Sequence, residues 1–143
     1  MSVALSGDLS MSSTWQQVGQ VTKLYIYHVK FLAHVEVDQF NVKPSGAQDK
    51  IMMDRQFMVV DKKGKMITAR RYPNMSLVVP TVSQTQLVLS YPGMEEVKVD
   101  IPRHVVVGVP RHECEAWGES CDGVDLGDRV GEWLSDIIIQ DSQ

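Results

Sequence analysis

Hydrophobic residues alternate with polar ones over several short stretches of the chain, and most stretches end at Pro, Gly or a group of polar residues. The alternation is clearest over 86–91, where Leu87, Leu89 and Tyr91 fall on one face of an extended strand, and again over 97–101. A period of two residues is typical of a half-buried β-strand. Further β-compatible runs lie at 15–30, 35–42, 55–60, 65–71, 75–82 and 105–109. Many short strands separated by turn residues predict a mainly β, barrel-like domain of antiparallel strands.

The distribution of apolar residues, Pro and Gly refines several of these predictions. The segment 15–30 carries apolar side chains on both faces, so we expect a strand that is covered on both sides. Pro80 removes a backbone donor from the run over 75–82, so that strand lies at a sheet edge or ends there. The Pro and Gly of 43–46 predict a turn. The pattern over 47–53 leaves a loop and a single helical turn open as alternatives.

A polar sequence that ends in Gly, at 61–64, separates two of the β-compatible runs. Such a connection predicts a hairpin, because Gly adopts the positive φ that a tight reversal needs. A hairpin brings its outer ends together, which would place Arg55 beside Arg70 and Arg71. One interpretation is a solvated rim paired to Asp54. The other is an anion site, because guanidinium groups match the geometry of phosphate.

The period of the pattern changes near the end of the chain. Apolar residues there recur every three to four positions, which predicts an amphipathic helix over 126–139. We expect Asp125 to cap its N-terminus and Asp128 to interact favourably with the helix dipole in the first turn. We expect Trp133 to pack onto the β domain. The residues of the apolar face are Leu126, Val130, Trp133, Leu134 and Ile137.

The chain has 143 residues, a length that fits one domain with its own hydrophobic core. Its net charge is −4, which argues against general nucleic-acid binding, since such binding requires a basic surface. No apolar run is long enough to span a membrane. Residues 1–14 are rich in Ser and contain no Lys or Arg, so we interpret them as a disordered leader before a domain over 15–143.

Cysteine is rare, because the chain contains only Cys114 and Cys121. Unpaired thiols suit a reducing compartment, so we expect an intracellular protein, either cytoplasmic or associated with mitochondria. A zinc site made from His112 and both cysteines would lack the usual paired spacing and a clear fourth ligand. We therefore interpret both cysteines as ordinary thiols and expect no metal site. We interpret His28 as a packed, hydrogen-bonded residue.

Several short motifs follow one another along the chain from Trp15 onward. They are Trp-Gln-Gln-Val-Gly at 15–19, Leu-Tyr-Ile-Tyr-His-Val-Lys at 24–30, Asp-Arg-Gln-Phe at 54–57, Ile-Thr-Ala-Arg at 67–70, Asp-Leu-Gly-Asp at 125–128 and Trp-Leu-Ser at 133–135. This series resembles the N-terminal β-barrel domain of the MOSC proteins (molybdenum cofactor sulfurase C-terminal family), closest to the mitochondrial amidoxime-reducing branch. The Asp-Arg motif followed by Thr-Ala-Arg is the most specific part of the resemblance.

In that family, a Lys-Ser pair and the Arg of the Asp-Arg motif contact the phosphate and pterin of the molybdenum cofactor. The resemblance therefore implies Lys30, Arg55 and Arg70 as cofactor-binding residues, and it implies no catalytic residue in this chain. Some positions depart from the family pattern by replacing its Pro, Ser and Gly, and these are His28, Phe31 and His34. The Ser hydroxyl that would follow Lys30 is replaced by the aromatic ring of Phe31.

The resemblance implies the N-terminal module of a molybdenum-cofactor oxidoreductase, and we expect this chain alone to have no catalytic activity. Family enzymes continue into a MOSC domain that supplies the molybdenum-ligating Cys. We expect that domain to be absent from this chain and to be its partner, in cis or in trans. The alternative is a free-standing, non-enzymatic ligand- or protein-binding β-barrel that has lost the cofactor chemistry. The departures from the family pattern favour this alternative, whereas the retained cationic residues favour the module.

Overall fold

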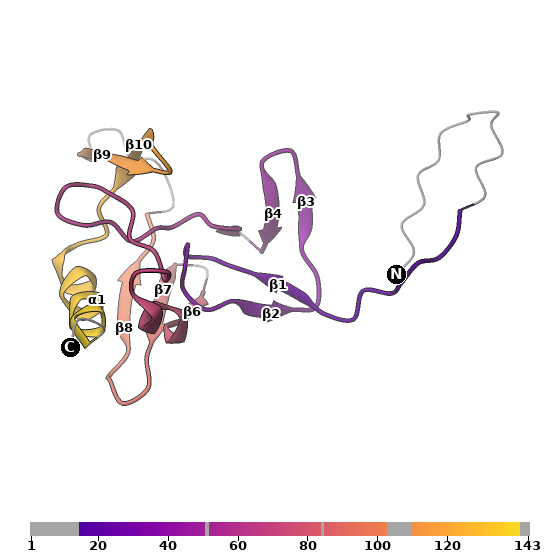
Figure 1. Cartoon of the computed structure of the whole chain (residues 1–143), viewed down its shortest axis with the longest axis horizontal. Helices are drawn as coiled ribbons and strands as arrows, with labels where there is room; N and C mark the ends of the chain where they lie inside the picture. The colour runs from indigo at the N-terminus through magenta and orange to yellow at the C-terminus, as the bar shows by residue number, and fades with distance from the viewer. Residues whose placement is uncertain (1–14, 51, 84, 103–109, 141–143) are drawn as a thin grey trace.

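The computed structural model describes residues 15–50, 52–83, 85–102 and 110–140. Short antiparallel strands and one C-terminal helix make up its regular structure, as Figure 1 shows, and this confirms the predicted mainly β class. Within the described ranges the strands belong to four small sheets and do not close into one continuous barrel. The strand predicted over 105–109 lies outside the described residues.

The segments with the clearest alternation of apolar and polar residues lie in a three-stranded antiparallel sheet. Strands β6 (Val79–Val82), β7 (Gln86–Ser90) and β8 (Val97–Asp100) pair in that order. Apolar side chains on one face of β7 and β8 enter the core, as the period of two predicts. These buried side chains belong to Leu87, Leu89, Val97 and Val99. Pro80 lies on β6 at the edge of the sheet, which confirms the prediction made from its missing donor.

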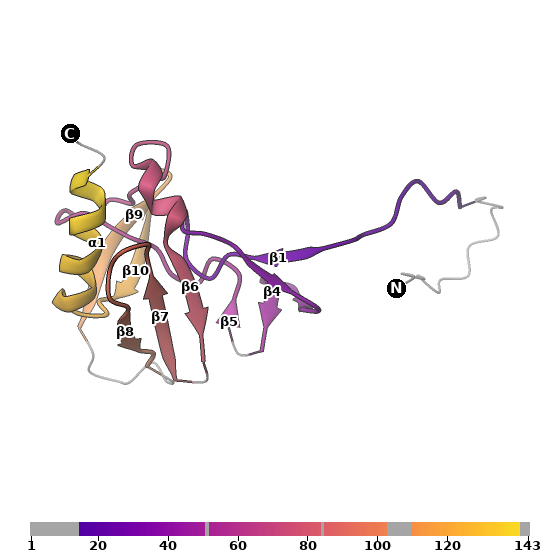
Figure 2. The same ribbon diagram turned by 90° about the horizontal axis from the view of Figure 1, so that it is seen from below.

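Helix α1 (Asp128–Gln140) covers this sheet from one side, where it contacts β8 and the 3-10 helix η1 (Pro73–Leu77). Figure 2 shows the helix lying alongside the sheet strands. Leu134 and Ile137 are buried, and both belong to the main hydrophobic core cluster. The predicted helix is therefore confirmed, with its apolar face against the sheet.

The packing of α1 follows the sequence, but the prediction that Asp125 caps its N-terminus is wrong. Asp125 does not reach the helix itself, because its carboxylate accepts a hydrogen bond from the Gly127 N–H at 2.8 Å, just before the helix begins at Asp128. The Trp133 ring packs against the core cluster, as expected. Its indole N–H also donates to the backbone carbonyl of Glu95 at 2.8 Å. This bond fixes the helix to the turn before β8.

The first strand of the chain is much shorter than predicted. Strand β1 (Leu24–Ile26) covers a small part of 15–30 and pairs with β2 (Val35–Val37) in an antiparallel ladder. Residues 15–23 extend away from the body of the molecule (Figures 1 and 2). Val18 is 97% exposed, so the prediction of a strand covered on both faces is wrong. An apolar composition favours burial of a segment, but burial also requires a neighbouring element that covers it.

A second small sheet follows, made of β3 (Asn41–Lys43), β4 (Gly46–Asp49) and β5 (Met52–Met53). The turn predicted at 43–46 is confirmed, because it joins β3 to β4. Neither alternative left open for 47–53 describes this segment, since it contributes to β4 and β5. The side chains of β3 and β4 are exposed or only half-buried, so little burial is present to impose a clear alternation on the sequence there.

The hairpin predicted at 61–64 is present. The Asp61 carboxylate accepts hydrogen bonds from the backbone N–H groups of Lys63 at 2.8 Å and Lys65 at 3.0 Å, and so holds the turn. Gly64 has φ +77°, the positive value expected of the turn glycine. The arms of this hairpin are single bridges rather than long strands, so the predicted extended strands on both sides are wrong.

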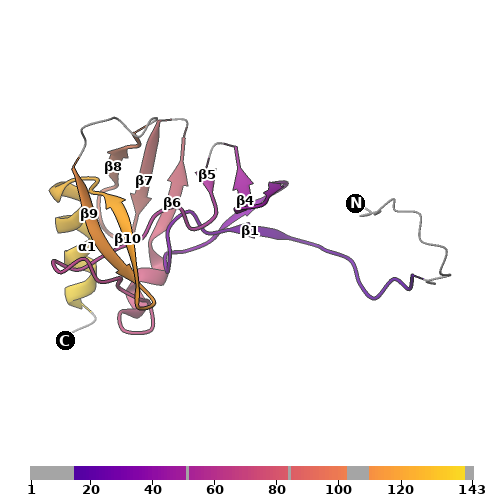
Figure 3. The ribbon, with the colours of Figure 1, turned by 90° about the horizontal axis from the view of Figure 1, so that it is seen from above.

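The last two strands, β9 (Arg111–Ala116) and β10 (Glu119–Val124), form a hairpin of their own, visible in Figure 3. Its connection is the two-residue turn Trp117 and Gly118, with φ of +58° and +84°. Positive φ at both central residues is the type I′ geometry that matches strand twist. Cys114 lies on β9 and Cys121 on β10, so both cysteines are in strands.

The β9–β10 hairpin docks on the 61–64 turn region through backbone hydrogen bonds. The Glu115 N–H donates to the Gly64 carbonyl at 2.9 Å, and the Met66 N–H donates to the Glu115 carbonyl at 3.0 Å. A side chain at Gly64 would place its Cβ 2.5 Å from the carbonyl oxygen of Glu113. The close approach of these two segments therefore requires glycine at this position.

Candidate functional site

Two short segments, 27–30 and 54–57, lie side by side and hold the predicted cationic residues Lys30 and Arg55. A parallel bridge pairs Val29 with Phe57. The Lys30 N–H donates to the Phe57 carbonyl at 2.9 Å. These bonds place Lys30 and Arg55 on one hydrogen-bonded backbone unit.

The Asp54 side chain closes the other end of this unit. Its Oδ1 accepts a hydrogen bond from the backbone N–H of Tyr27 at 2.8 Å. In return, the Arg55 N–H donates to the Tyr27 carbonyl, and the Phe57 N–H donates to the His28 carbonyl at 3.1 Å. The Asp-Arg motif therefore has a structural role that its sequence alone did not reveal, because Asp54 satisfies a backbone donor of a distant segment.

The Arg55 guanidinium is exposed but already has neighbours. It pairs with the Asp54 carboxylate and lies over the Tyr27 ring, with 5.1 Å between its central carbon and the ring centroid. Arg55 itself has φ +55°, an uncommon conformation for a residue with a side chain. An Arg has five N–H donors, so one carboxylate leaves donors that an incoming anion can use.

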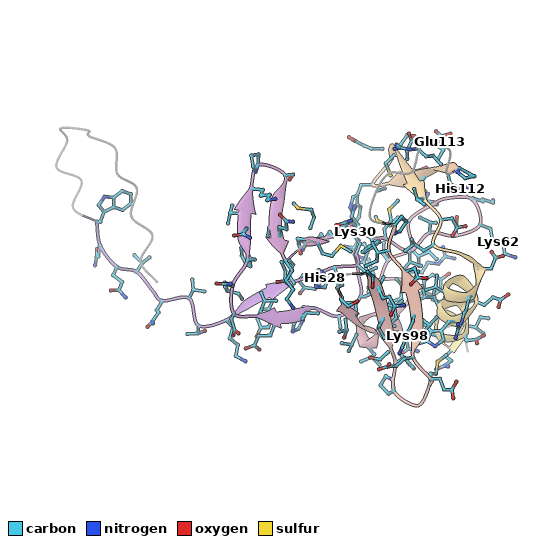
Figure 4. The ribbon with its side chains drawn as sticks, turned by 180° about the vertical axis from the view of Figure 1, so that it is seen from behind. His28, Lys30, Lys62, Lys98, His112 and Glu113 are labelled. Carbon is cyan, nitrogen blue, oxygen red and sulfur yellow. The ribbon has the colours of Figure 1, made fainter. Side chains whose placement is uncertain are left out.

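Lys30 is half-buried in the turn that follows His28, and Figure 4 shows these two side chains close together at the junction of the small β sheets and the main body. Within the described part of the chain, no acidic side chain lies within ion-pair distance of Lys30. The next residue, Phe31, has φ +65°, and its ring lies 5.8 Å from the ring of Trp117 between centroids. An aromatic pair thus occupies the position where a Ser hydroxyl was expected from the resemblance.

Arg70 is exposed in the turn at 69–71. Pairing of the hairpin arms ends at the bond from the Ile67 N–H to the Val59 carbonyl, 2.9 Å long, because the chain then turns at Thr68. Among the residues that the structure describes, the backbone hydrogen bonds of this turn run from Arg71 and Tyr72 to Thr68, and none joins it to 27–30 or 54–57. Lys30 and Arg55 thus lie on neighbouring segments of one unit, with Arg55 opposite Tyr27, and Arg70 lies in a turn outside that unit.

His28 follows only part of its prediction as a packed, hydrogen-bonded residue. It is packed as expected, with 2% of its surface exposed, but its Nδ1 has no hydrogen-bond partner among the described atoms. Its Nε2 lies 4.0 Å from a carboxylate oxygen of Asp49. Burial lowers the pKa of His28, while the nearby Asp49 and Asp54 oppose that effect. The neutral imidazole is therefore the form that this site favours.

Open depressions in the surface lie elsewhere, between the 61–68 segment and the β9–β10 hairpin. One has a volume of about 270 Å³ and the other about 260 Å³. Their linings include Glu115 and Gly118, and neither includes Lys30, Arg55 or Arg70. Arg55 and Arg70 are exposed and Lys30 is half-buried, so an anion bound to them would remain in contact with water.

Over residues 15–50, 52–83, 85–102 and 110–140, no three His, Cys, Asp or Glu side chains are grouped so that they could hold a metal ion. In the same ranges, no helix combines the length and apolar character needed to cross a bilayer.

Comparison with known proteins identifies relatives over nearly the whole chain. Residues 18–141 match the model of the MOSC N-terminal beta barrel domain. The mitochondrial amidoxime-reducing component 1 of Xenopus laevis is 34% identical over 132 residues, which is 90% of this chain and 36% of that protein. The mitochondrial amidoxime reducing component 2 of Rattus norvegicus is 35% identical over 123 residues, which is 86% of this chain and 36% of that protein. The chain thus spans little more than a third of the length of these curated relatives.

A solved structure supports the fold independently. A solution structure of a protein from Bordetella bronchiseptica superposes with a TM-score of 0.50 and 21% sequence identity. The similar region covers 57% of this chain and 62% of that protein. At this level of identity the comparison concerns the fold alone.

Proposed function

The chain belongs to the family of MOSC N-terminal beta barrel domains, and from that premise we propose that it is the cofactor-contacting domain of a molybdenum-cofactor oxidoreductase of the amidoxime-reducing type. Its relatives that carry the name amidoxime-reducing component match 86% to 90% of this chain. In this proposal the domain supplies cationic contacts to the cofactor and no catalytic group.

The observation that carries the proposal is the shared backbone unit of Lys30 and Arg55. An ammonium and a guanidinium held on adjacent segments suit one phosphate group, which Arg can bind through two parallel N–H bonds while Lys contributes a point charge. The Asp54 carboxylate orients the guanidinium of Arg55 through their ion pair. Arg70 is the third proposed contact, and it would reach the same anion from the neighbouring turn.

The residues of this unit fit an anionic cofactor in part. Lys30 and Arg55 fit the phosphate, since both carry positive charge at neutral pH and Lys30 is not ion-paired in the described chain. Phe31 does not fit a hydroxyl contact, because its side chain has no polar atom; its ring packs near Trp117 instead. The bound cofactor would supply the redox centre for reduction of an N–O bond. The residues of this chain would bind and orient its phosphate end.

We propose that a second MOSC domain, in cis or in trans, covers the cationic surface in the working enzyme. Without such a cover the site stays wet, and each exposed charge contributes little to binding. We therefore expect this chain alone to bind inorganic phosphate with a Kd on the order of millimolar, about −4 kcal/mol, and more weakly as salt is added.

A phosphate titration followed by amide resonances in NMR spectra tests the proposal. Resonances of 29–31, 54–57 and 69–71 should shift together in the wild type, and Arg55→Ala should abolish the shifts. Arg129→Ala is the matched control, because it removes an exposed guanidinium from α1. If Arg129→Ala reduces the shifts as much as Arg55→Ala does, the binding is a general charge effect and the proposed site is wrong.

The contact between Phe31 and Trp117 favours a second candidate, a non-enzymatic ligand- or protein-binding domain that has lost the cofactor contacts. An aromatic pair beside Lys30 removes the hydroxyl that the family pattern uses and leaves Trp117 71% exposed. If phosphate shifts no resonance near 30 or 55 and Arg55→Ala only lowers the Tm, this candidate replaces the first.

A further inference from the structure

The two cysteines are directly opposed in the antiparallel ladder of β9 and β10, where Cys114 pairs with Cys121. The backbone groups of Glu115 point away from β10. Its N–H donates to the Gly64 carbonyl, and its carbonyl accepts from the Met66 N–H. Backbone groups alternate in direction along a strand, so those of Cys114 point toward β10 and the cysteine pair is a hydrogen-bonded one. Opposed Cα atoms in such a pair lie about 5.5 Å apart, inside the range of roughly 4.4–6.8 Å found for disulfides. Their Cβ atoms lie near the wide end of about 4.5–5.5 Å, so the two strands must approach by about 1 Å to reach the roughly 3.5–4.5 Å of a disulfide.

The side chains of the pair lie on the same face of the hairpin, as opposed residues of a ladder do. The Cys114 thiol donates to the His112 carbonyl at 3.5 Å. It also lies against Gly123, where a Cβ would be 3.3 Å from the Cys114 sulfur. The Cys114 sulfur therefore occupies the space that a side chain at position 123 would fill. Forming the bond requires rotation of the Cys114 side chain about its Cα–Cβ bond, away from Gly123, together with a small approach of the two strands.

We propose that Cys114 and Cys121 are a modification site, at which a small-molecule disulfide of the glutathione class converts the two thiols into a reversible intramolecular disulfide. This inference concerns the β9–β10 hairpin and does not depend on the proposed cofactor contacts. A depression lined by Cys114, Glu113 and Ser120 lies at the same hairpin. Cys121 lies outside that lining but is only half-buried, so a small molecule can reach its sulfur.

The reaction takes place in two exchanges. The Cys121 thiolate attacks one sulfur of the small disulfide, a Cys121–glutathione bond forms, and one glutathione thiolate leaves. The Cys114 thiol then loses its proton, and its sulfur attacks the Cys121 sulfur. The second glutathione thiolate leaves as the Cys114–Cys121 bond forms. Two cysteine thiols are oxidised, one small disulfide is reduced to two thiols, and the protons pass from the cysteines to the leaving thiolates.

The order of the two steps follows from the environments of the cysteines. Cys121 is half-buried, whereas Cys114 is buried with 8% of its surface exposed. Burial raises the pKa of the Cys114 thiol, and the neighbouring Cys121 and Asp122 raise it further. Cys121 is therefore the attacking residue, and Cys114 reacts once the mixed disulfide has formed beside it.

The chain is tested by incubating it with oxidised glutathione under native conditions and measuring its intact mass. The expected product has lost two hydrogens, carries no glutathione, and yields one cross-linked peptide containing Cys114 and Cys121. Dithiothreitol should restore the original mass. Two stable glutathione adducts per chain, or a disulfide-linked dimer as the main product, would overturn the proposal.

Serine variants separate the two roles. Cys114→Ser should stop at one glutathione on Cys121, because the resolving thiol has been removed. Cys121→Ser should react at least tenfold more slowly than Cys114→Ser, since only the buried thiol remains. Equal rates for the two single variants, measured under conditions where each keeps the circular dichroism spectrum of the wild type, would contradict the proposed order.

A comparison that needs no variant tests whether the fold itself positions the thiols. At a fixed ratio of reduced to oxidised glutathione, the ratio of closed to open cysteine pair should be at least tenfold higher in the folded chain than in urea. By thermodynamic linkage the oxidised chain should then have the higher Tm. An equal ratio in both states, or a lower Tm after oxidation, would show that the hairpin does not favour the disulfide.

Discussion

Asp54 and Tyr27 are joined across 27 positions of the chain by a hydrogen bond of 2.8 Å from the Tyr27 N–H to the Asp54 carboxylate. Asp54→Ala removes this bond and the ion pair to Arg55. Hydrogen bonds to charged groups contribute about 1.5–3 kcal/mol, so we expect the free energy of unfolding to fall by about that amount. Urea denaturation measures it. Asp136→Ala is the control, because it removes an exposed carboxylate from α1, and it should change the free energy of unfolding by less than about 0.5 kcal/mol.

The helix is anchored by a side chain with no exposed surface. Ile137 is 0% exposed, whereas Ile139 on the same helix is 56% exposed. We expect Ile137→Ala to lower the free energy of unfolding by about 2–5 kcal/mol through lost burial and the cavity that remains. Ile139→Ala carries the same change in side chain and in helix propensity at an exposed position, so it should cost under about 1 kcal/mol. Similar losses in thermal or urea unfolding for both variants would mean that α1 is not docked as described.

A comparison of Gly64 with Gly93 separates two reasons why a position requires glycine, which are a positive φ and the close approach of a neighbouring backbone. Both have positive φ, of +77° and +80°, but a Cβ at Gly64 would lie 2.5 Å from the Glu113 carbonyl while a Cβ at Gly93 would meet nothing within 4 Å. Gly93→Ala should therefore cost about 1–2 kcal/mol for the backbone conformation alone. Gly64→Ala should cost more than that, because the 64–66 segment must also move away from β9. Equal losses in the two variants would show that the close approach is not needed for stability.

The helix and the strands over 86–101 could be predicted because their side-chain periods, near 3.6 and 2, are local properties that burial then preserves. The pairing of 27–30 with 54–57 could not be predicted in this way. A parallel contact between distant segments is decided by the tertiary structure, and here it depends on the Asp54 carboxylate. Lys30 and Arg55 were identified by resemblance. Their position on one backbone unit was not visible in the sequence.

Two other differences have physical causes of the same kind. The apolar residues of 15–23 gave a strong β signal, yet propensity does not say whether a partner strand is available, and Val21 is 75% exposed. The unpartnered Nδ1 of His28 also has no signal in the sequence. A buried histidine has the same place in a strand pattern with or without a hydrogen-bond partner. The sequence predicted a packed, hydrogen-bonded His28, and for Nδ1 the hydrogen-bonded part of that prediction is wrong.

His28 should make stability depend on pH. Its pKa in the folded chain is lowered below the ordinary value of 6.5 by burial, so the unfolded chain binds more protons just below that pH. The contribution to stability is present above about pH 6.5 and is lost as the pH falls toward the folded-state pKa. Asp49, Asp54 and Lys50 face the imidazole and set how far the pKa falls.

The measurement is Tm as a function of pH for the wild type and His28→Gln. The wild type should lose Tm between pH 7 and pH 5, and the variant should lose less over the same interval. His34→Gln is the control, because His34 is exposed. If His28→Gln keeps the full pH dependence of the wild type, another group is responsible.

The docking of β9 on Gly64 also affects how fast the chain folds. The β9–β10 hairpin and the three-stranded sheet are built from contacts between near neighbours in sequence, which form quickly. The bonds from Glu115 to Gly64 and Met66 join segments that are ~50 residues apart, so they require closure of a long loop. We infer that this docking forms late, after the transition state for folding. Substitutions at Gly64 should then speed unfolding and leave the folding rate nearly unchanged.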